Sequence, residues 1–256
     1  MSKIINRIPV ISILGLVLVI VLFFVWKNIS DKIEEDLIPS PQPYKLSVTP
    51  TPKVSQSKPT SLVTSYPVAS EVNLAVPFTS QAPGQIWDEY HKEFCEEASV
   101  LMAVSYINNT TITNIEFADQ KLFEIKDFEE KRFGYYKDTG AEDTAIILKE
   151  MYKIEKVTVI YNPTIEIIKK ALNEKKVIII PAAGRQLGNP HYQSPGPLYH
   201  MLVIKGYTKN GDFITNDPGT RWGKNYIYSS EVIMNAIHDW NGGDVENGSK
   251  VMIVVG

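Results

Sequence analysis

An uncharged apolar run near the amino terminus decides how the rest of the chain can be organised. From Ile8 to Trp26 the sequence reads IPVISILGLVLVIVLFFVW, with no charged residue. A helix needs about 20 apolar residues to cross the hydrocarbon core of a bilayer. A secretory signal has a shorter apolar region that ends in small residues, whereas this run ends in bulky ones. We therefore expect a short tail over 1–7 and an uncleaved transmembrane signal-anchor helix over 8–26, with Trp26 at the membrane interface.

The charges that flank this run set its expected orientation. Lys3 and Arg7 precede the run and Lys27 and Lys32 follow it, so the free amino terminus makes the only difference between the two sides. The flank of a membrane span that carries more positive charge usually stays on the cytoplasmic side. The sequence therefore predicts a single-pass membrane protein whose amino terminus is cytoplasmic and whose larger part is extracytoplasmic.

A proline-rich segment follows the apolar run. Seven of the 16 prolines lie between Pro39 and Pro67, interleaved with serine, threonine and lysine and without apolar periodicity. Such a composition is typical of an extended, semi-rigid linker. We interpret 27–70 as a disordered stalk, either a spacer of selected length or a simple tether.

Charge and motifs exclude several classes of function. The formal net charge is −3 and the acidic excess is larger beyond residue 70, so no clustered basic surface indicates a nucleic-acid partner. The stretch GTRWGK over 219–224 departs from a phosphate-binding loop in its glycine spacing and its last residue, which excludes a nucleotide. His91, His191 and His200 could nominally gather a zinc ion, but neither an HExxH motif nor paired cysteines support a metal site. We expect no cofactor and no metal.

Residues 71–256 have the pattern of one α+β domain of two lobes. Helical patterns dominate its first half and strand patterns its second. Lys209, Asn210 and Gly211 lie between two strand-like runs and predict an antiparallel hairpin. The expected helices cover 95–107, 113–128, 141–152, 164–174 and about 230–239, and the expected strands cover 156–161, 176–183, 200–207, 212–217 and 250–255.

Cys95 is the single cysteine of the chain. It begins the apolar stretch CEEASVLMAVSYI, where the first turn of a buried helix can lower the pKa of a thiol. The adjacent Glu96 and Glu97 oppose that effect unless their side chains point away from the sulfur. A lone cysteine in a helix is otherwise a packing residue. The remaining residues of a reactive site must distinguish these two interpretations.

Three other residues supply what thiol catalysis requires. His200 opens a strand and could act as the base, and Asp217 ends the partner strand of the hairpin, where it could orient the imidazole. Gln81 precedes the cysteine and carries an amide donor that suits an oxyanion hole. Each residue alone is a weak signal, whereas the ordered set predicts a nucleophilic site.

The runs VPFTSQAPGQIW, CEEASVLMA, HMLVIKGY and NDPGTRWG carry a family resemblance. Over about residues 72–256 the chain resembles the papain-like cysteine peptidases, specifically stand-alone relatives of the double-glycine leader peptidases of bacteriocin exporters. The resemblance implies Cys95 as nucleophile, His200 as base, Asp217 as its orienting group and Gln81 as oxyanion donor. Many members continue the cysteine with Gly-Pro, where this chain has Glu96-Glu97. The stretch 83–94 looks like an insert on the substrate side.

We therefore expect a membrane-anchored, extracytoplasmic cysteine peptidase of papain-like fold that hydrolyses a peptide or amide bond. Its expected substrate is a peptide or a cell-wall peptide. A non-catalytic module that binds a peptide or wall polymer in the same cleft is the alternative from another class, and Glu96-Glu97 favours it. A cell-wall amidase or transpeptidase would use the same residues. The loop over 184–199 either walls the cleft or is a surface connection.

Overall fold

The computed structural model describes residue 15 and residues 18–27, 38–44 and 69–256. The chain divides into two units, Met1–Ile38 and Pro39–Gly256. In the first unit residues 18–27 are helical, while the rest of the predicted anchor over 8–26 lies outside the described residues, except for residue 15. None of the helices formed by the described residues has the length and hydropathy of a membrane span.

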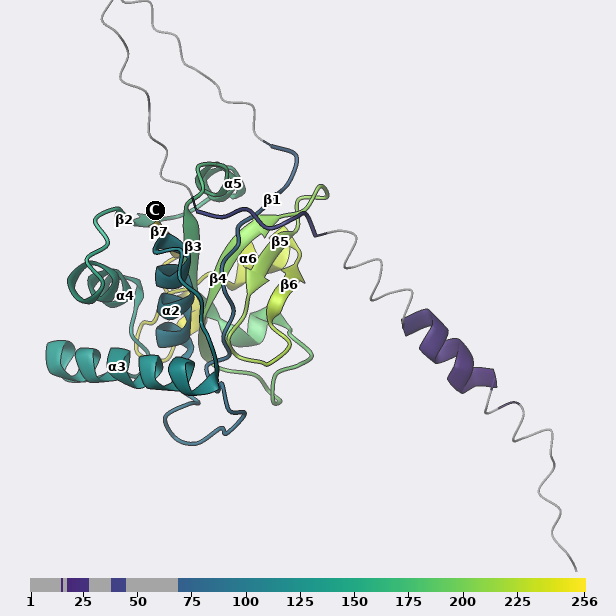
Figure 1. Cartoon of the computed structure of the whole chain (residues 1–256), viewed down its shortest axis with the longest axis horizontal. Coiled ribbons are helices and arrows are strands. Elements are labelled where there is room, and N and C mark those ends of the chain that lie inside the picture. The colour runs from purple at the N-terminus through teal and green to yellow at the C-terminus, as the bar shows by residue number, and fades with distance from the viewer. Residues whose placement is uncertain (1–14, 16–17, 28–37, 45–68) are drawn as a thin grey trace, which may run out of the picture. The chain divides into compact units, whose positions relative to one another are not determined.

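An antiparallel sheet forms the centre of the second unit (Figure 1). Its strand order is β2-β7-β3-β4-β5-β6, and the short β1 pairs with β4. Strands β3 and β4 are buried along their whole length, which agrees with their nearly continuous apolar sequences. The strands in the described part of the chain are β1 (Val72–Asn73), β2 (Val157–Tyr161), β3 (Val177–Ala183), β4 (Tyr199–Tyr207), β5 (Phe213–Asn216), β6 (Lys224–Tyr228) and β7 (Val251–Val255).

Helix α2 (Cys95–Ile107) is the central helix of this unit. It packs against β3 and β4 and also contacts α3, so nearly all of its residues are buried. Its sequence is apolar on most sides, as a helix enclosed by sheet and helix requires. The other helices are α3 (Ile115–Phe133), α4 (Ala141–Ile146), α5 (Ile165–Asn173) and α6 (Ser230–Ala236), with a π-helical turn over Ile147–Met151 and 3-10 turns over Gly184–Leu187 and Val245–Asn247.

The mixed fold predicted from the sequence is confirmed, with three differences in its elements. Helix α3 runs to Phe133 because Asn114 caps its start and Gly134, at a φ of 86°, closes its end. The predicted helix over 141–152 changes to a π-helical turn at Ile147. Strand β6 was not predicted, because its residues KNYIY follow a turn and lack a clear alternating pattern.

The hairpin of β4 and β5 fixes the relation between the two halves of the candidate site. The strands pair antiparallel, with Tyr207 opposite Phe213, and the turn between them contains Gly211 at a φ of 93°. A positive φ of this kind favours glycine. Because Val203 pairs with Asn216, the beginning of β4 and the residue after β5 lie at the same end of the hairpin.

A short piece of the proline-rich segment lies against the folded unit. Gln42 forms a parallel bridge with Leu74, and its backbone N–H donates to the carbonyl of Asn73 at 2.7 Å. The ring of Tyr44 packs edge-on against Tyr106 of α2, with centroids 5.3 Å apart. Residues 39–44, assigned to the stalk from the sequence, therefore contact the domain, whereas 45–68 lie outside the described residues.

Candidate active site

Cys95 is the first residue of α2 and is buried. Its Sγ donates a hydrogen bond to Oε2 of Glu96 at 3.0 Å. One turn along the helix, Ser99 donates to the carbonyl of Met201 at 3.1 Å, and Met201 directly follows His200. The first turns of α2 are therefore attached to the part of β4 that carries the candidate base.

The surroundings of Cys95 favour the neutral thiol. Burial raises the pKa of Cys95 well above its usual value, and the charges of Glu96 and Glu97 raise it further. The backbone N–H of Met201 acts in the opposite direction and lowers it. The lowered thiol pKa expected at a helix start is therefore outweighed by desolvation and by the neighbouring carboxyl groups.

Three buried carboxyl groups, those of Glu96, Glu97 and Glu129, lie close to one another near Cys95. Burial raises the pKa of Glu96, of Glu97 and of Glu129, and that of Glu129 reaches about 8. Within the described part of the chain the oxygens of Glu97 accept no hydrogen bond from an N–H group or an alcohol, and the carboxyl group of Glu97 is hydrogen-bonded to that of Glu129. Thr139 donates to Oε1 of Glu129 at 3.1 Å. Carboxyl groups that are buried with few donors retain their protons at neutral pH.

His200 and Asp217 form a buried pair. The Nε2 atom of His200 lies 2.8 Å from Oδ1 of Asp217, and the side chains are 1% and 0% exposed. The edge of the Tyr192 ring packs against the imidazole, with centroids 5.4 Å apart and planes at 74°. The hairpin thus brings together the two residues that the sequence predicted as base and orienting group.

Asp217 accepts hydrogen bonds from four donors besides His200. The hydroxyl groups of Tyr192 and Tyr228 each donate to Oδ2 at 2.6 Å, Asn189 donates at 3.1 Å, and the N–H of Gly219 donates to Oδ1 at 3.0 Å. Burial alone would raise the pKa of Asp217, but the charge of His200 and these hydrogen bonds lower it to about 2. Asp217 is therefore ionised throughout the neutral range.

Two glycines permit the close packing around this pair. A Cβ atom at Gly219 would lie 2.9 Å from Cε1 of His200 and equally close to Cε1 of Tyr192. A Cβ at Gly184 would lie 2.6 Å from the carbonyl oxygen of Pro197 and 3.1 Å from Cβ of His200. Neither position has room for a side chain: the imidazole and Tyr192 require glycine at 219, and the backbone of Pro197 requires it at 184.

One pocket of about 300 Å³ is lined by Cys95, His200 and Gln81. The residues around them come from the stretch before α2, from the loop over 184–199 and from the turn after β5. The structure thus brings three of the four predicted site residues to one cavity, with the fourth, Asp217, buried behind His200.

Gln81 forms hydrogen bonds that the sequence did not predict. Its Nε2 atom donates to the backbone carbonyls of His91 and Lys92, at 2.9 and 3.0 Å, so both amide protons are engaged. Its backbone N–H donates to the carbonyl of Pro218 at 3.0 Å. Gln81 therefore connects the stretch 83–94 to the turn that follows Asp217.

The three histidines that could nominally bind zinc each have other partners. His91 contacts Asp88 and Asp119 at 2.7 Å each, whereas His191 packs near the ring of Trp222. Within the described ranges no group of three histidine, cysteine or carboxylate side chains is placed to hold a metal ion.

Sequence reasoning missed most of the partners of Asp217. The loop over 184–199 was expected either to wall the cleft or to be a surface connection, and the structure shows that it lines the pocket. It supplies Asn189 and Tyr192 to the carboxylate, and β6 supplies Tyr228. The glycine and proline content of the loop was the available signal, but it did not single out these residues.

Comparison with known families decides the assignment. Residues 73–242 match the model of the Peptidase C39 like family. The chain belongs to this family. The matched range includes Gln81, Cys95, His200 and Asp217. No curated protein matches the chain.

Two solved structures are similar to this C39-like chain. A structure from Bacillus anthracis, assigned as a C39-like peptidase, is 14% identical with a TM-score of 0.46, over 73% of this chain and 98% of that one. The prointerpain A fragment of Prevotella intermedia is also 14% identical, with a TM-score of 0.36, over 73% of this chain and 57% of that one.

Proposed function

We propose that this C39-like protein is a cysteine peptidase of papain-like fold that hydrolyses a peptide or amide bond. The observation that carries the proposal is the shared pocket of Cys95 and His200, with the imidazole fixed by an ionised, buried Asp217. A thiol, a base and an oriented carboxylate are the parts that acyl transfer through a cysteine requires.

The hydrogen bonding of His200 supports one path for the proton in this proposal. Because Nε2 is bonded to Asp217, Nδ1 is the ring nitrogen that can take the proton from Cys95. The sulfur then attacks the substrate carbonyl, and the imidazolium returns the proton to the leaving amine. Water, deprotonated by the same nitrogen, hydrolyses the thioester and releases the acid. The charge of Asp217 stabilises the imidazolium throughout.

Oxyanion stabilisation falls to the backbone N–H of Cys95 and the amide of Gln81 in this proposal. Phe94, the N-cap residue of α2, offers no side-chain cap, so the first N–H groups of the helix are not used in capping. Gln81 would exchange one of its bonds, to His91 or Lys92, for the developing oxyanion.

Hydrolysis of a peptide library by the purified full-length chain tests this function. Cys95→Ala and His200→Ala should each lower turnover by about 10³-fold or more, because they remove the nucleophile and the base. Arg132→Gln, on the exposed face of α3, is the control. Equal hydrolysis by the Cys95→Ala variant would contradict the proposal.

One observation favours a second candidate, a non-catalytic peptide-binding module. The thiol of Cys95 donates to Glu96 and has a raised pKa, which disfavours a thiolate in the resting protein. A binding module predicts peptide binding that is unchanged by Cys95→Ala, together with no hydrolysis by the wild-type chain. A cell-wall amidase or transpeptidase would instead give Cys95-dependent turnover of cell-wall peptides alone.

We also propose that the domain is held outside the cytoplasm by the run over 8–26. Its length and lack of charge support the proposal. Protease added to intact cells should release a soluble fragment that contains the C39-like domain. Protection of the full-length chain would contradict this topology.

A further inference from the structure

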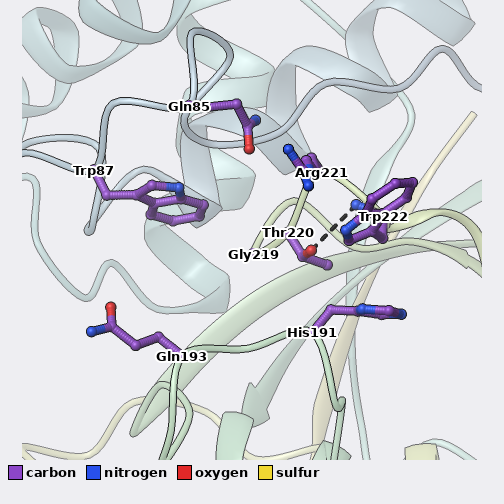
Figure 2. A pocket seen from close by; sticks show the side chains of 8 residues that line it. All are labelled: Gln85, Trp87, His191, Gln193, Gly219, Thr220, Arg221 and Trp222. Atoms are coloured by element: carbon purple, nitrogen blue, oxygen red, sulfur yellow. Dashed lines mark hydrogen bonds between the residues drawn. The ribbon is translucent and has the colours of Figure 1, made fainter.

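A second pocket lies beside the candidate active site. It has a volume of about 220 Å³ and shares Trp87, Gln193 and Gly219 with the pocket of Cys95 and His200. Figure 2 shows Gln85 and Trp87, from the stretch before α2, facing Thr220, Arg221 and Trp222 from the turn after β5. Since the two pockets share part of their walls, a bound peptide could occupy both.

Arg221 is the charged residue of this second pocket. It is exposed and forms no salt bridge with any described carboxylate. Its guanidinium lies 4.8 Å from the ring centroid of Trp222, which holds the planar group against an aromatic face and leaves its N–H edge for a ligand. The backbone N–H of Trp222 donates a hydrogen bond to Oγ1 of Thr220 at 3.2 Å, which helps to fix the position of Trp222 in the turn.

The charged side chains that line the pockets of the site have one sign. Lys92 lines the active-site pocket, and Arg185 lines a third pocket that shares Tyr192 and Ser194 with it. None of the residues that line these three pockets is acidic. The whole chain nevertheless has a net charge of −3. The surfaces that would meet a substrate therefore carry basic and no acidic lining residues, which favours an anionic ligand.

The position of His200 indicates which part of a substrate would enter the second pocket. Gly219, which lines both pockets, packs directly against the imidazole. The imidazolium must protonate the leaving amine, so the leaving-group side of the substrate lies next to His200. The pocket that continues past Gly219 is then on that side.

We propose that this pocket binds a substrate carboxylate on the leaving-group side of the scissile bond, through the guanidinium of Arg221. The carboxylate belongs either to an acidic side chain or to the carboxyl terminus of the substrate. Trp87 and Trp222 contact the apolar part of the same residue. This inference rests on the proposed peptidase function and names its substrate class: a peptide that is acidic just beyond the cleaved bond.

The test begins with the bond that the full-length chain cleaves in a peptide library. Three peptides are then made around that bond. The first has Glu just after it, the second has Gln there, and both end in an amide. The third is neutral and ends at that residue with a free carboxyl group. A preference for the first peptide assigns an acidic side chain, and a preference for the third assigns the chain terminus.

The wild-type chain should cleave an acidic peptide with a kcat/KM about fivefold higher than its neutral counterpart, with the ratio falling as salt is added. Arg221→Gln should bring the ratio close to one and Arg221→Glu should invert it. Arg132→Gln removes an exposed arginine that pairs with Glu150 at 2.8 Å and should leave the ratio unchanged. Equal cleavage of acidic and neutral peptides by the wild-type chain would overturn the inference alone.

Absence of any cleavage would instead contradict the proposed function, and binding then decides the subsite. Three peptides of one fixed sequence are used, which differ only as above: one with Glu and one with Gln at one position, both ending in an amide, and a neutral one that ends there with a free carboxyl group. Their binding is followed by the fluorescence of the full-length chain, to which Trp87 and Trp222 contribute. Tighter binding of an acidic peptide that is lost in Arg221→Gln supports the carboxylate subsite. Equal binding of acidic and neutral peptides overturns it.

Discussion

Asp217 and Glu129 are both fully buried carboxyl groups in one domain, yet at neutral pH we expect Asp217 to be ionised and Glu129 to be mostly protonated. Asp217 accepts five hydrogen bonds and has a pKa of about 2, whereas Glu129 is hydrogen-bonded by Thr139 and by the carboxyl group of Glu97 and has a pKa of about 8. Burial raises the pKa in both cases, so the charge of His200 and the larger number of donors around Asp217 decide the difference. The surroundings of His200 and Asp217 stabilise charged groups, whereas the surroundings of Cys95 favour the neutral thiol.

The largest expected effect comes from removing the charge of Asp217. Asp217→Asn should lower kcat/KM by about 10²-fold or more, because the imidazolium loses its counter-charge and several donors meet an amide N–H₂ group. Peptide hydrolysis measures the effect, and circular dichroism shows whether the variant folds. Unchanged kinetics in a folded variant would mean that Asp217 does not serve His200.

A smaller loss should follow from crowding the imidazole. Gly219→Ala places a methyl group 2.9 Å from Cε1 of His200, so the ring must move, and kcat should fall about tenfold. Gly84→Ala is the matched control, because its new methyl group would meet Ile115 at an ordinary 3.8 Å. Equal kinetics in both variants would contradict the assigned position of His200.

Replacing Glu96 tests whether neighbouring carboxyl groups keep the Cys95 thiol neutral. Glu96→Gln replaces the carboxyl group that accepts the hydrogen bond of the Cys95 thiol and that raises the pKa of the thiol, although burial remains the larger cause. Alkylation by iodoacetamide at pH 8 should become several-fold faster, and because the chain has a single cysteine it reports on Cys95 alone. Glu89→Gln, on the exposed stretch before α2, should leave the rate unchanged. A slower reaction in Glu96→Gln would show that Glu96 activates the thiol.

The smallest effects are those of Glu129 and Asp217 on the free energy of unfolding. Glu129 loses its contribution as the pH rises, and Asp217 loses its contribution as the pH falls. Because the pKa of Glu129 is raised from 4.5 to about 8, the folded state holds a proton that the unfolded state releases, and stability falls as the pH rises through this window. Glu129→Gln should flatten that fall by up to about 1.4 kcal/mol per pH unit. The pKa of Asp217 is lowered, so its contribution is present above about 3.8 and is lost as the pH falls towards 2. Thermal melts from about pH 2 to pH 8 measure both slopes, and a flat wild-type profile above pH 5 would contradict the buried acids.

The mixed helix-and-strand domain and the candidate residues could be predicted from local patterns. Periodicity located α2, β3 and β4, and the ordered residues Cys95, His200 and Asp217 indicated the chemistry. Protonation could not be predicted in the same way. It depends on long-range contacts, such as those of Asp217 with Tyr192 and Tyr228, and no local spacing encodes them. The sequence likewise placed Glu96 and Glu97 beside the thiol but did not show that Glu129 lies near them.

The central claim is that Cys95 attacks a peptide carbonyl with His200 as its base, and a covalent intermediate tests it most directly. The full-length chain is mixed with a p-nitrophenyl ester of a peptide that it cleaves, quenched in acid within one turnover, and its intact mass is measured. The account predicts a mass increase equal to the acyl group, located on Cys95, slowed in His200→Ala and absent in Cys95→Ala. Release of p-nitrophenol with no acyl group on Cys95, or equal acylation of the Cys95→Ala variant, would contradict it.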